Sequence, residues 1–233
     1  MKNTGGSSEA KRRAGEHAAD LVEDGEVVGL GTGSTTAHAI RALGRAVDAG
    51  LDVQAIPTSF QSRQLALDAE IPLTSLDAVD GVDLAIDGAD QVAARDDGGF
   101  DLVKGGGAAH AREKVVDAAA DRFVVVADPS KLVDPLDYPV PVEVLPDARP
   151  TVAEAVRELG GEPSLRTARR KDGPVVTENG NLVLDCDFGP IDDPATLATG
   201  LSALPGVLEQ GLFVGLADEV HIGHADDVDV LGR

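Results

Sequence analysis

The residues best suited to chemistry lie in four short stretches, and the first is GTGST at positions 31–35. Glycines let backbone N–H groups face an anion, and Ser and Thr hydroxyls add further donors. No Gly-Lys-Ser/Thr ends the stretch, so it is not a Walker A loop, and Thr36 stands where a dinucleotide fingerprint has Gly or Ala. A small phosphate fits best, with a plain helix cap and tight turn as the alternative. The candidate residues are Thr32, Gly33, Ser34 and Thr35.

The second stretch is DGAD, which comprises Asp87, Gly88, Ala89 and Asp90. Two carboxylates three residues apart in a loop can accept hydrogen bonds from sugar hydroxyls. They could also hold a metal, but the sequence offers no convincing set of further ligands, so we expect no metal. A simple Asx-turn is the alternative.

The third stretch is KGGG, which comprises Lys104, Gly105, Gly106 and Gly107. Three successive glycines cost chain entropy and let a ligand lie against the backbone. Glu113 follows about two turns into the next helix, where a carboxylate can act as a general base. Because Arg112 and Lys114 flank Glu113, we expect it to be ionised at neutral pH. The alternative is a solvated glutamate that pairs with those bases.

The fourth stretch is DPSK, which ends at Lys131. Residues 104–131 contain five bases and four acids, whereas the remaining 205 residues carry a net charge of −22. A segment that is locally close to neutral in so acidic a chain indicates that positive charge is needed there, for which an anionic ligand is the simplest reason. Chance clustering with salt bridges along a helix is the alternative.

Short apolar runs place these stretches near the ends of predicted strands. Buried strands are expected at 26–30, 52–56, 82–87 and 122–128, with helices between them, the first running from Ser7 or Ser8 to about Glu23. An Asp- and Gly-rich loop is expected before KGGG. This alternation predicts an α/β fold with a doubly wound parallel sheet, which binds ligands at the carboxyl ends of its strands. Polar sets at successive strand ends therefore favour an active site.

The pattern changes near Pro135. From there the order strand, helix, strand, strand, helix, strand is that of the ferredoxin-like split unit, and its last strand is expected at 206–215. We expect one domain from residues 1–134 plus 211–233 and a smaller α+β domain at 135–210.

Composition excludes several classes of protein. The 233 residues include 20 Lys+Arg and 41 Asp+Glu, and the net charge of −21 argues against binding to nucleic acid or anionic membranes. No GxSxG elbow is present, which argues against a serine hydrolase. The N-terminal stretch is polar and the apolar runs are far shorter than a membrane span, so we expect a soluble, cytoplasmic protein. The single cysteine, Cys186, is expected to be buried and inert.

Taken together, the chain resembles the A-type ribose-5-phosphate isomerases almost from end to end. Three of the segments that carry the resemblance lie outside the candidate site and therefore support it independently. The segments are GLGTGST (29–35), AIDGAD (85–90), KGGGAA (104–109), REK (112–114), VADPSK (126–131), VPVEVLP (140–146), NGNLVLD (179–185) and LPGVLEQGLFVG (204–215).

The resemblance implies a Rossmann-like catalytic domain with a ferredoxin-like lid, assembled as a homodimer or homotetramer. It implies interconversion of ribose 5-phosphate and ribulose 5-phosphate in the pentose phosphate pathway, without metal or cofactor. By position, Glu113 matches the general base, while 32–35, 87–90, 104–107 and Lys131 match substrate-binding segments. Gln91 and His110 depart from the residues usual in the family, and neither is a matched site residue.

This reaction moves a proton between C2 and C1 through an enediolate, which one carboxylate can do. We expect Glu113 as the base and Lys104, with Asp87 beside it, as the oxyanion stabiliser. A sugar-phosphate sensor of the same fold is a second hypothesis, but the first strand begins by residue 26 and leaves no room for a DNA-binding helix-turn-helix. A phosphosugar deaminase or lactonase is a third, and it would need a catalytic His near the site, where only His110 qualifies.

The acid-rich, lysine-poor composition predicts a protein that is stable in concentrated salt. Added salt screens the repulsion among surface carboxylates, so the thermal midpoint is expected to rise between low and molar KCl by on the order of 10 °C. Melting curves over a series of KCl concentrations check this. Equal stability without added salt would contradict it.

Overall fold

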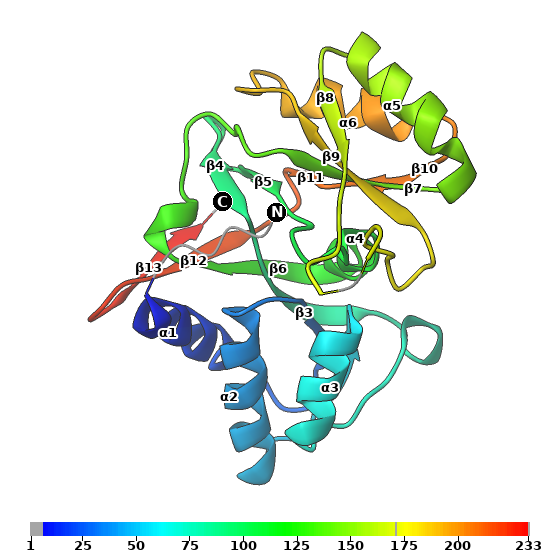
Figure 1. Ribbon diagram of the computed structural model, residues 1–233. Helices are drawn as coiled ribbons and strands as arrows, with labels where there is room; N and C mark the ends of the chain where they lie inside the picture. Colours follow the sequence, from blue (N-terminus) through cyan, green and yellow to red (C-terminus); the bar gives the residue numbers. More distant parts are fainter. Residues whose placement is uncertain (1–6, 171, 233) are drawn as a thin grey trace.

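A six-stranded sheet forms the centre of the protein, whose computed structural model describes residues 7–170 and 172–232 (Figure 1). The strand order is β13-β12-β6-β3-β1-β2, and all neighbours are parallel except β13, which is antiparallel to β12. The predicted doubly wound α/β architecture is thereby confirmed. The strands are β1 (Val27–Leu30), β2 (Gln54–Pro57), β3 (Val82–Gly88), β6 (Ala120–Ala127), β12 (Glu219–Gly223) and β13 (Val228–Gly232).

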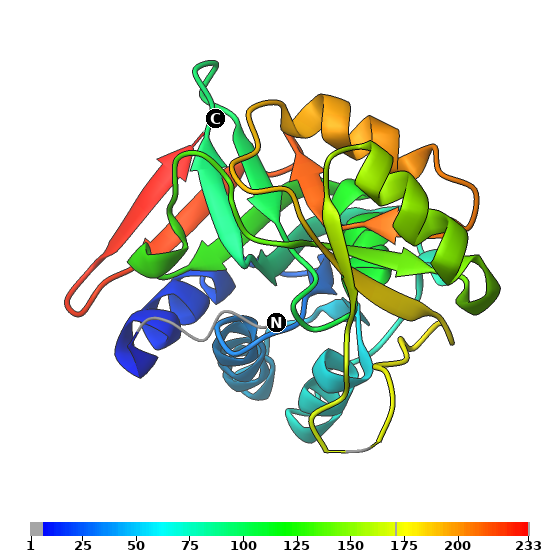
Figure 2. The same ribbon diagram turned by 45° about the horizontal axis from the view of Figure 1, so that its top comes forward.

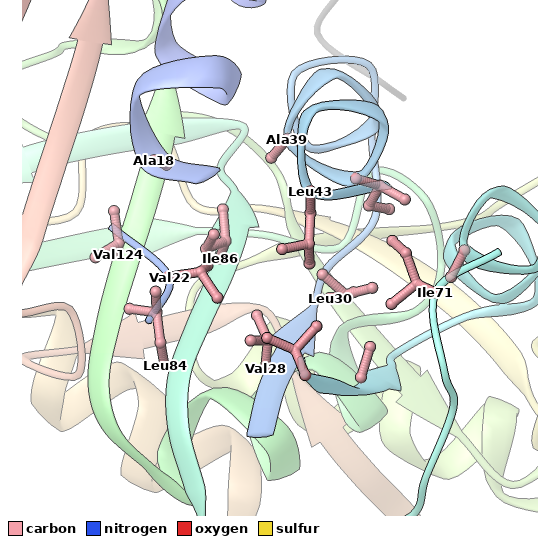
Figure 3. Close-up of a cluster of buried hydrophobic side chains, with 14 of the residues drawn as sticks. Ala18, Val22, Val28, Leu30, Ala39, Leu43, Ile71, Leu84, Ile86 and Val124 are labelled. Carbon is pink, nitrogen blue, oxygen red and sulfur yellow. The ribbon is translucent and has the colours of Figure 1, made fainter. Parts of the chain in front are cut away.

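Helices cover both faces of this sheet. On one face lie α1 (Ser8–Ala19), α2 (Thr36–Asp48) and α3 (Phe60–Asp68), and on the other lies α4 (His110–Ala118). Figure 3 shows Leu43 of α2 packed against strand residues that include Leu30, within a cluster that also contains Ile86. The buried residues of this cluster occupy the apolar positions whose spacing in the sequence predicted these strands and helices.

A three-stranded sheet contains a hairpin where the sequence analysis expected a loop. It consists of β11 (Leu212–Val214), β5 (Phe100–Val103) and β4 (Gln91–Ala94), in that order. The Asp-Asp-Gly-Gly run at 96–99 is the turn of a β4–β5 hairpin, in which Arg95 N–H donates to the Gly99 carbonyl. Those turn residues between two apolar runs are typical of a hairpin, and the loop expectation was wrong.

A four-stranded antiparallel sheet with the order β10-β7-β9-β8 forms the upper part of the molecule in Figure 1. Helices α5 (Arg149–Glu158) and α6 (Pro194–Ser202) lie together on one side of it, as Figure 2 also shows. The expected ferredoxin-like order is confirmed. Its strands are β7 (Val140–Val144), β8 (Glu162–Leu165), β9 (Leu182–Asp187) and β10 (Val207–Gln210). The division into domains at 135 and 211 stays a prediction.

The expected single strand at 206–215 breaks at Gly211 into β10 and β11, which belong to different sheets. A Cβ on Gly211 would lie 2.3 Å from the Lys104 carbonyl oxygen and 2.7 Å from Pro141 Cδ, so only glycine fits where the chain passes between sheets. The chain returns to the main sheet only from β12 on, later than the expected return at Gly211, and adds β12 and β13, which the sequence analysis did not resolve. Helix α1 ends at Ala19, four residues before the expected position.

Short 3₁₀ turns lie at Leu76–Ala78, Pro129–Lys131 and Pro146–Ala148. Cys186 is buried as expected. Within residues 7–170 and 172–232, no helix is long and apolar enough to cross a membrane. Residues 1–6, which begin the polar N-terminal stretch, lie outside the described part of the chain.

Candidate active site

The candidate residues converge on one cavity at the carboxyl ends of the parallel strands. β1 and β3 are neighbours there, with Leu30 opposite Ile86, and β3 pairs in turn with β6, so that the segments after all three strands meet. Because the chain leaves β1 toward β2 on one side and reaches β3 on the other, this is the switch point of the sheet. Every candidate residue named from the sequence lines this cavity except Asp87.

Asp87 lies beneath the cavity and is fully buried. Its Oδ1 accepts hydrogen bonds from Thr32 N–H (3.0 Å) and Gly88 N–H (2.6 Å). A Cβ on Gly31 would lie 1.9 Å from Asp87 Cγ, so glycine at 31 is required for the two strand ends to meet. The structure therefore corrects the expectation that both carboxylates of DGAD face a sugar, because only Asp90 lines the cavity.

Residues 32–36 form one wall of the cavity. The Thr32 hydroxyl donates to Ser59 Oγ (2.7 Å), so both its N–H and its hydroxyl are bound to protein atoms. Gly33, Ser34 and Thr35 complete the turn into α2. Thr36, which the sequence analysis treated only as a departure from a fingerprint, also lines the cavity, and its buried hydroxyl has no hydrogen-bond partner in the protein.

Three lysines line the cavity: Lys11, Lys104 and Lys131. Lys11 comes from α1 and was missed, because a single lysine early in a helix carries no distinguishing pattern. Lys114, which contributes to the positive charge of 104–131, points elsewhere: its ammonium contacts Glu209 Oε1 (2.8 Å) and donates to the Gln210 carbonyl (2.6 Å). Of the four lysines in the described part of this acidic chain, three thus face one cavity, which favours an anionic ligand.

The Lys104 ammonium is the centre of a buried ionic cluster. It donates to the Gly88 carbonyl (2.6 Å) and lies 2.7 Å from Asp87 Oδ2, 3.3 Å from Glu113 Oε2 and 3.9 Å from Asp117 Oδ2. Burial alone would lower the pKa of this lysine, but the three carboxyl groups raise it above its usual value. Lys104 is therefore a fixed cation at neutral pH.

Glu113 has a different environment from the one expected. Its side chain is buried, and burial together with the Asp87 charge raises its pKa to about 8, against the opposing effect of Lys104. The expectation that Arg112 and Lys114 keep it ionised is wrong, since adjacent residues on a helix point in different directions. Arg112 instead donates to the Pro57 carbonyl (3.4 Å). Near neutral pH, Glu113 is a carboxyl poised to exchange a proton.

The three glycines at 105–107 form a loop, called the glycine loop below, which accepts or donates hydrogen bonds on two sides. Gly106 N–H donates to Asp90 Oδ2 (2.7 Å), and Arg166 Nη1 donates to the Gly105 carbonyl (2.8 Å). Arg166 follows β8 of the four-stranded sheet and forms a two-point ion pair with Asp185 of β9. The sequence analysis did not single out Arg166 or Asp185. From the four-stranded sheet, Arg166 and Asp185 together hold the glycine loop in place beside the cavity.

A second, larger hollow of about 630 Å³ lies between α3, α4 and β10. Its lining includes exposed apolar side chains such as Phe60, Val115 and Leu208. None of the four candidate stretches contributes to this hollow, although Ala111 and Arg112, which follow the third stretch, do line it. The smaller cavity therefore remains the candidate site, because the charged and hydroxyl-bearing groups converge there.

No group of three or more His, Cys, Asp or Glu side chains within the described ranges is arranged to hold a metal ion. His221 contacts His17 (Nδ1 to Nδ1, 3.0 Å) and Glu219, whereas His224 contacts Asp229. His221 and His224, which stand three residues apart in the sequence, thus have separate partners.

Comparison with known proteins shows the family to which this chain is similar. The family model described as ribose 5-phosphate isomerase A (phosphoriboisomerase A) matches residues 54–227. The chain is 70% identical to ribose-5-phosphate isomerase A from the halophile Haloarcula marismortui over 226 residues, which cover 97% of this chain and 96% of that protein.

Two solved structures have the same fold. Ribose 5-phosphate isomerase A from Methanocaldococcus jannaschii superposes with a TM-score of 0.92 at 44% identity, covering 98% of this chain and 100% of that one. A D-ribose-5-phosphate isomerase in complex with phospho-erythronic acid gives a TM-score of 0.93 at 42% identity with the same coverage.

The contact between Arg166 and the Gly105 carbonyl predicts that this side chain orders the glycine loop. Arg166→Lys retains the charge but loses the planar fork that binds Asp185 and the loop together. Amide hydrogen exchange at 105–107 is expected to become faster by about tenfold, a local opening free energy lower by about 1.4 kcal/mol. Arg157→Lys, in the exposed Arg157–Glu154 pair of α5, is the control. Unchanged exchange in Arg166→Lys would contradict the assignment.

Proposed function

The chain belongs to the ribose 5-phosphate isomerase A family and isomerises ribose 5-phosphate, and we propose that it does so in the cavity at the carboxyl ends of β1, β3 and β6, with Glu113 as the base. One observation carries this assignment. A buried carboxyl of raised pKa lies 3.3 Å from a fixed ammonium, in a cavity that three lysines and a hydroxyl-rich turn make suitable for a sugar phosphate.

The phosphate of the substrate is assigned to the wall formed by 33–36, at the start of α2. Backbone N–H groups and the positive end of a helix favour an anion there. The unpartnered Thr36 hydroxyl and the Lys11 ammonium add donors that the sequence analysis did not predict. Lys131 is a further candidate contact. Binding energy from this non-reacting group holds C1 and C2 in place for proton transfer.

Glu113 is assigned the transfer itself. In the open-chain aldose it removes the proton from C2, the released electron pair forms the C1–C2 double bond, and O1 takes up the negative charge. Return of that proton to C1 and movement of the O2 proton to O1 give the ketose. A base with a pKa near the working pH suits both halves of this exchange.

Lys104 and the glycine loop are assigned to the enediolate. The ammonium is 2% exposed and already has Gly88, Asp87 and Glu113 as partners. When Glu113 takes up a proton, its ion pair with the Lys104 ammonium is weakened, and a substrate oxygen can then approach that ammonium from the cavity side. Asp87 supports this as the carboxylate that anchors Lys104 from below, and Asp90 remains the candidate for a sugar hydroxyl.

The other expectations also belong to this proposal. We propose a cytoplasmic enzyme of the pentose phosphate pathway that needs no metal or cofactor and assembles as a homodimer or homotetramer. The close likeness to proteins named as isomerases supports catalysis over a sensor that binds the sugar phosphate without reaction. A phosphosugar deaminase or lactonase loses support, because His110 is fully buried and burial lowers its pKa to about 3.

Replacing Glu113 by Gln is expected to remove the base while keeping the shape of the side chain. Conversion of ribose 5-phosphate to ribulose 5-phosphate in molar KCl with a chelator present is expected to fall by about 10²–10⁴-fold in kcat. The thermal midpoint serves as the folding control. Full activity of the variant would refute the base assignment, and a wild type that binds the substrate without converting it would favour the sensor.

The raised pKa of Glu113 predicts the pH dependence of the reaction. The base form is required, and protons bind this carboxyl up to about pH 8, so kcat/KM is expected to fall as the pH drops below that value. The slope should approach tenfold per pH unit well below the midpoint. Initial rates from mildly acidic to alkaline pH in constant salt check it. A value of kcat/KM that stays constant down to the pH at which an ordinary glutamate binds a proton would contradict the raised pKa of Glu113.

A further inference from the structure

Asp117 is a second buried carboxyl group beside the proposed base, and neither the four motifs nor the mechanism uses it. It lies on α4 four residues after Glu113, so both side chains extend from the same face of the helix. Only 2% of Asp117 is exposed, and it is not among the cavity-lining residues. Neither of its oxygens accepts a hydrogen bond from a protein donor.

The charges around Asp117 do not balance if every group is ionised. From β3 it faces Asp87, from the loop after β5 it faces Lys104, and from its own helix it faces Glu113. One ammonium and three carboxylates would leave a net charge of −2 in a buried space. Burial of unpaired charge is costly, and closely spaced carboxyl groups respond by keeping protons.

Among the three carboxyl groups beside Lys104, Asp87 has the most hydrogen-bond donors. Its Oδ1 accepts two backbone hydrogen bonds, and its Oδ2 is paired with Lys104 at 2.7 Å. Each of these contacts favours the charged form. Asp117 has no comparable donor, and its nearest cation contact is the longer one of 3.9 Å. Protons therefore belong on Asp117 and, at lower pH, on Glu113.

We infer that Asp117 is a neutral carboxylic acid in the resting protein, that it donates a hydrogen bond to the Asp87 carboxylate, and that it is a positioning residue for Lys104 and Glu113. Burial and the Asp87 charge raise the pKa of Asp117 well above its usual range, with Lys104 acting in the opposite sense. The inference rests on the proposed role of Glu113.

A neutral Asp117 has a direct consequence for the base. With Glu113 protonated, the cluster of Lys104, Asp87, Glu113 and Asp117 carries no net charge, and with Glu113 ionised it carries −1. If Asp117 were also ionised, each removal of the Glu113 proton would bring the cluster to −2. The uncharged acid thus keeps the pKa of Glu113 within reach of neutral pH, while its hydrogen bond holds Asp87 against Lys104.

The first test measures the proton without catalysis. Wild-type protein labelled with ¹³C at aspartate side-chain carboxyls would be titrated by NMR in molar KCl. Ordinary aspartates ionise near pH 4, so one aspartate signal that stays in the protonated position at about pH 7 is expected, and Asp117→Asn should remove it. If every aspartate carboxyl is ionised at that pH, the inference is wrong. This readout is independent of whether Glu113 is the base.

The second test uses kinetics with matched variants. Asp117→Asn retains a neutral donor to Asp87, so kcat is expected within about threefold of wild type, with an unchanged acid limb of kcat/KM. Asp117→Ala removes the donor, and kcat should fall by about tenfold or more with little change in KM. Asp121→Asn, an exposed aspartate just beyond α4, is the surface control.

The two variants also give the outcomes that overturn the inference. A shift of the acid limb to lower pH by about one unit in Asp117→Asn would mean that a negative charge had been removed, and hence that Asp117 is an anion. Equal activity of Asp117→Asn and Asp117→Ala would mean that the hydrogen bond to Asp87 does not position Lys104 and Glu113. Loss of activity in Glu113→Gln with either result would leave the proposed function standing.

Discussion

The buried Lys104 ammonium, which lies among three carboxyl groups, makes the contacts on which the site depends. It joins the end of β3, through Asp87 and Gly88, to the loop after β5 and to Glu113 on α4. Removal of one member of such a buried set leaves uncompensated charge, which costs about 3–5 kcal/mol. The cluster therefore links the strand end, the glycine loop and the proposed base to one another.

The glycine loop is the point where the three sheets meet. Lys104 N–H donates to the Gly211 carbonyl at the break between β10 and β11, and Arg166 reaches the Gly105 carbonyl from beyond β8. The loop is thus ordered by the four-stranded sheet as well as by its own strand. A side chain next to the four-stranded sheet, Arg166, therefore helps to position the backbone of the glycine loop, which follows β5 of the three-stranded sheet.

Charge is distributed unevenly for a physical reason. An acidic surface keeps the protein soluble in salt, whereas an anionic substrate requires a positive potential where it binds. The chain meets both demands with few lysines, of which Lys11, Lys104 and Lys131 face the cavity. Two of the carboxyl groups beside Lys104, Glu113 and Asp117, are buried, and burial raises their pKa, so they add less negative charge there than a count of acidic residues indicates.

The sequence by itself determined the α/β fold, the ferredoxin-like order of the second sheet and most of the residues that line the cavity. Strand and helix periods, turn residues and glycine runs are local properties, and the carboxyl ends of parallel strands meet wherever such a sheet forms. Only the tertiary structure decided that Asp87 lies below the cavity, that Lys11 enters it, and that Glu113 faces Lys104 and Asp87 rather than Arg112 and Lys114. The protonation of a side chain depends on which groups surround it after burial, and residues distant along the chain supply those groups.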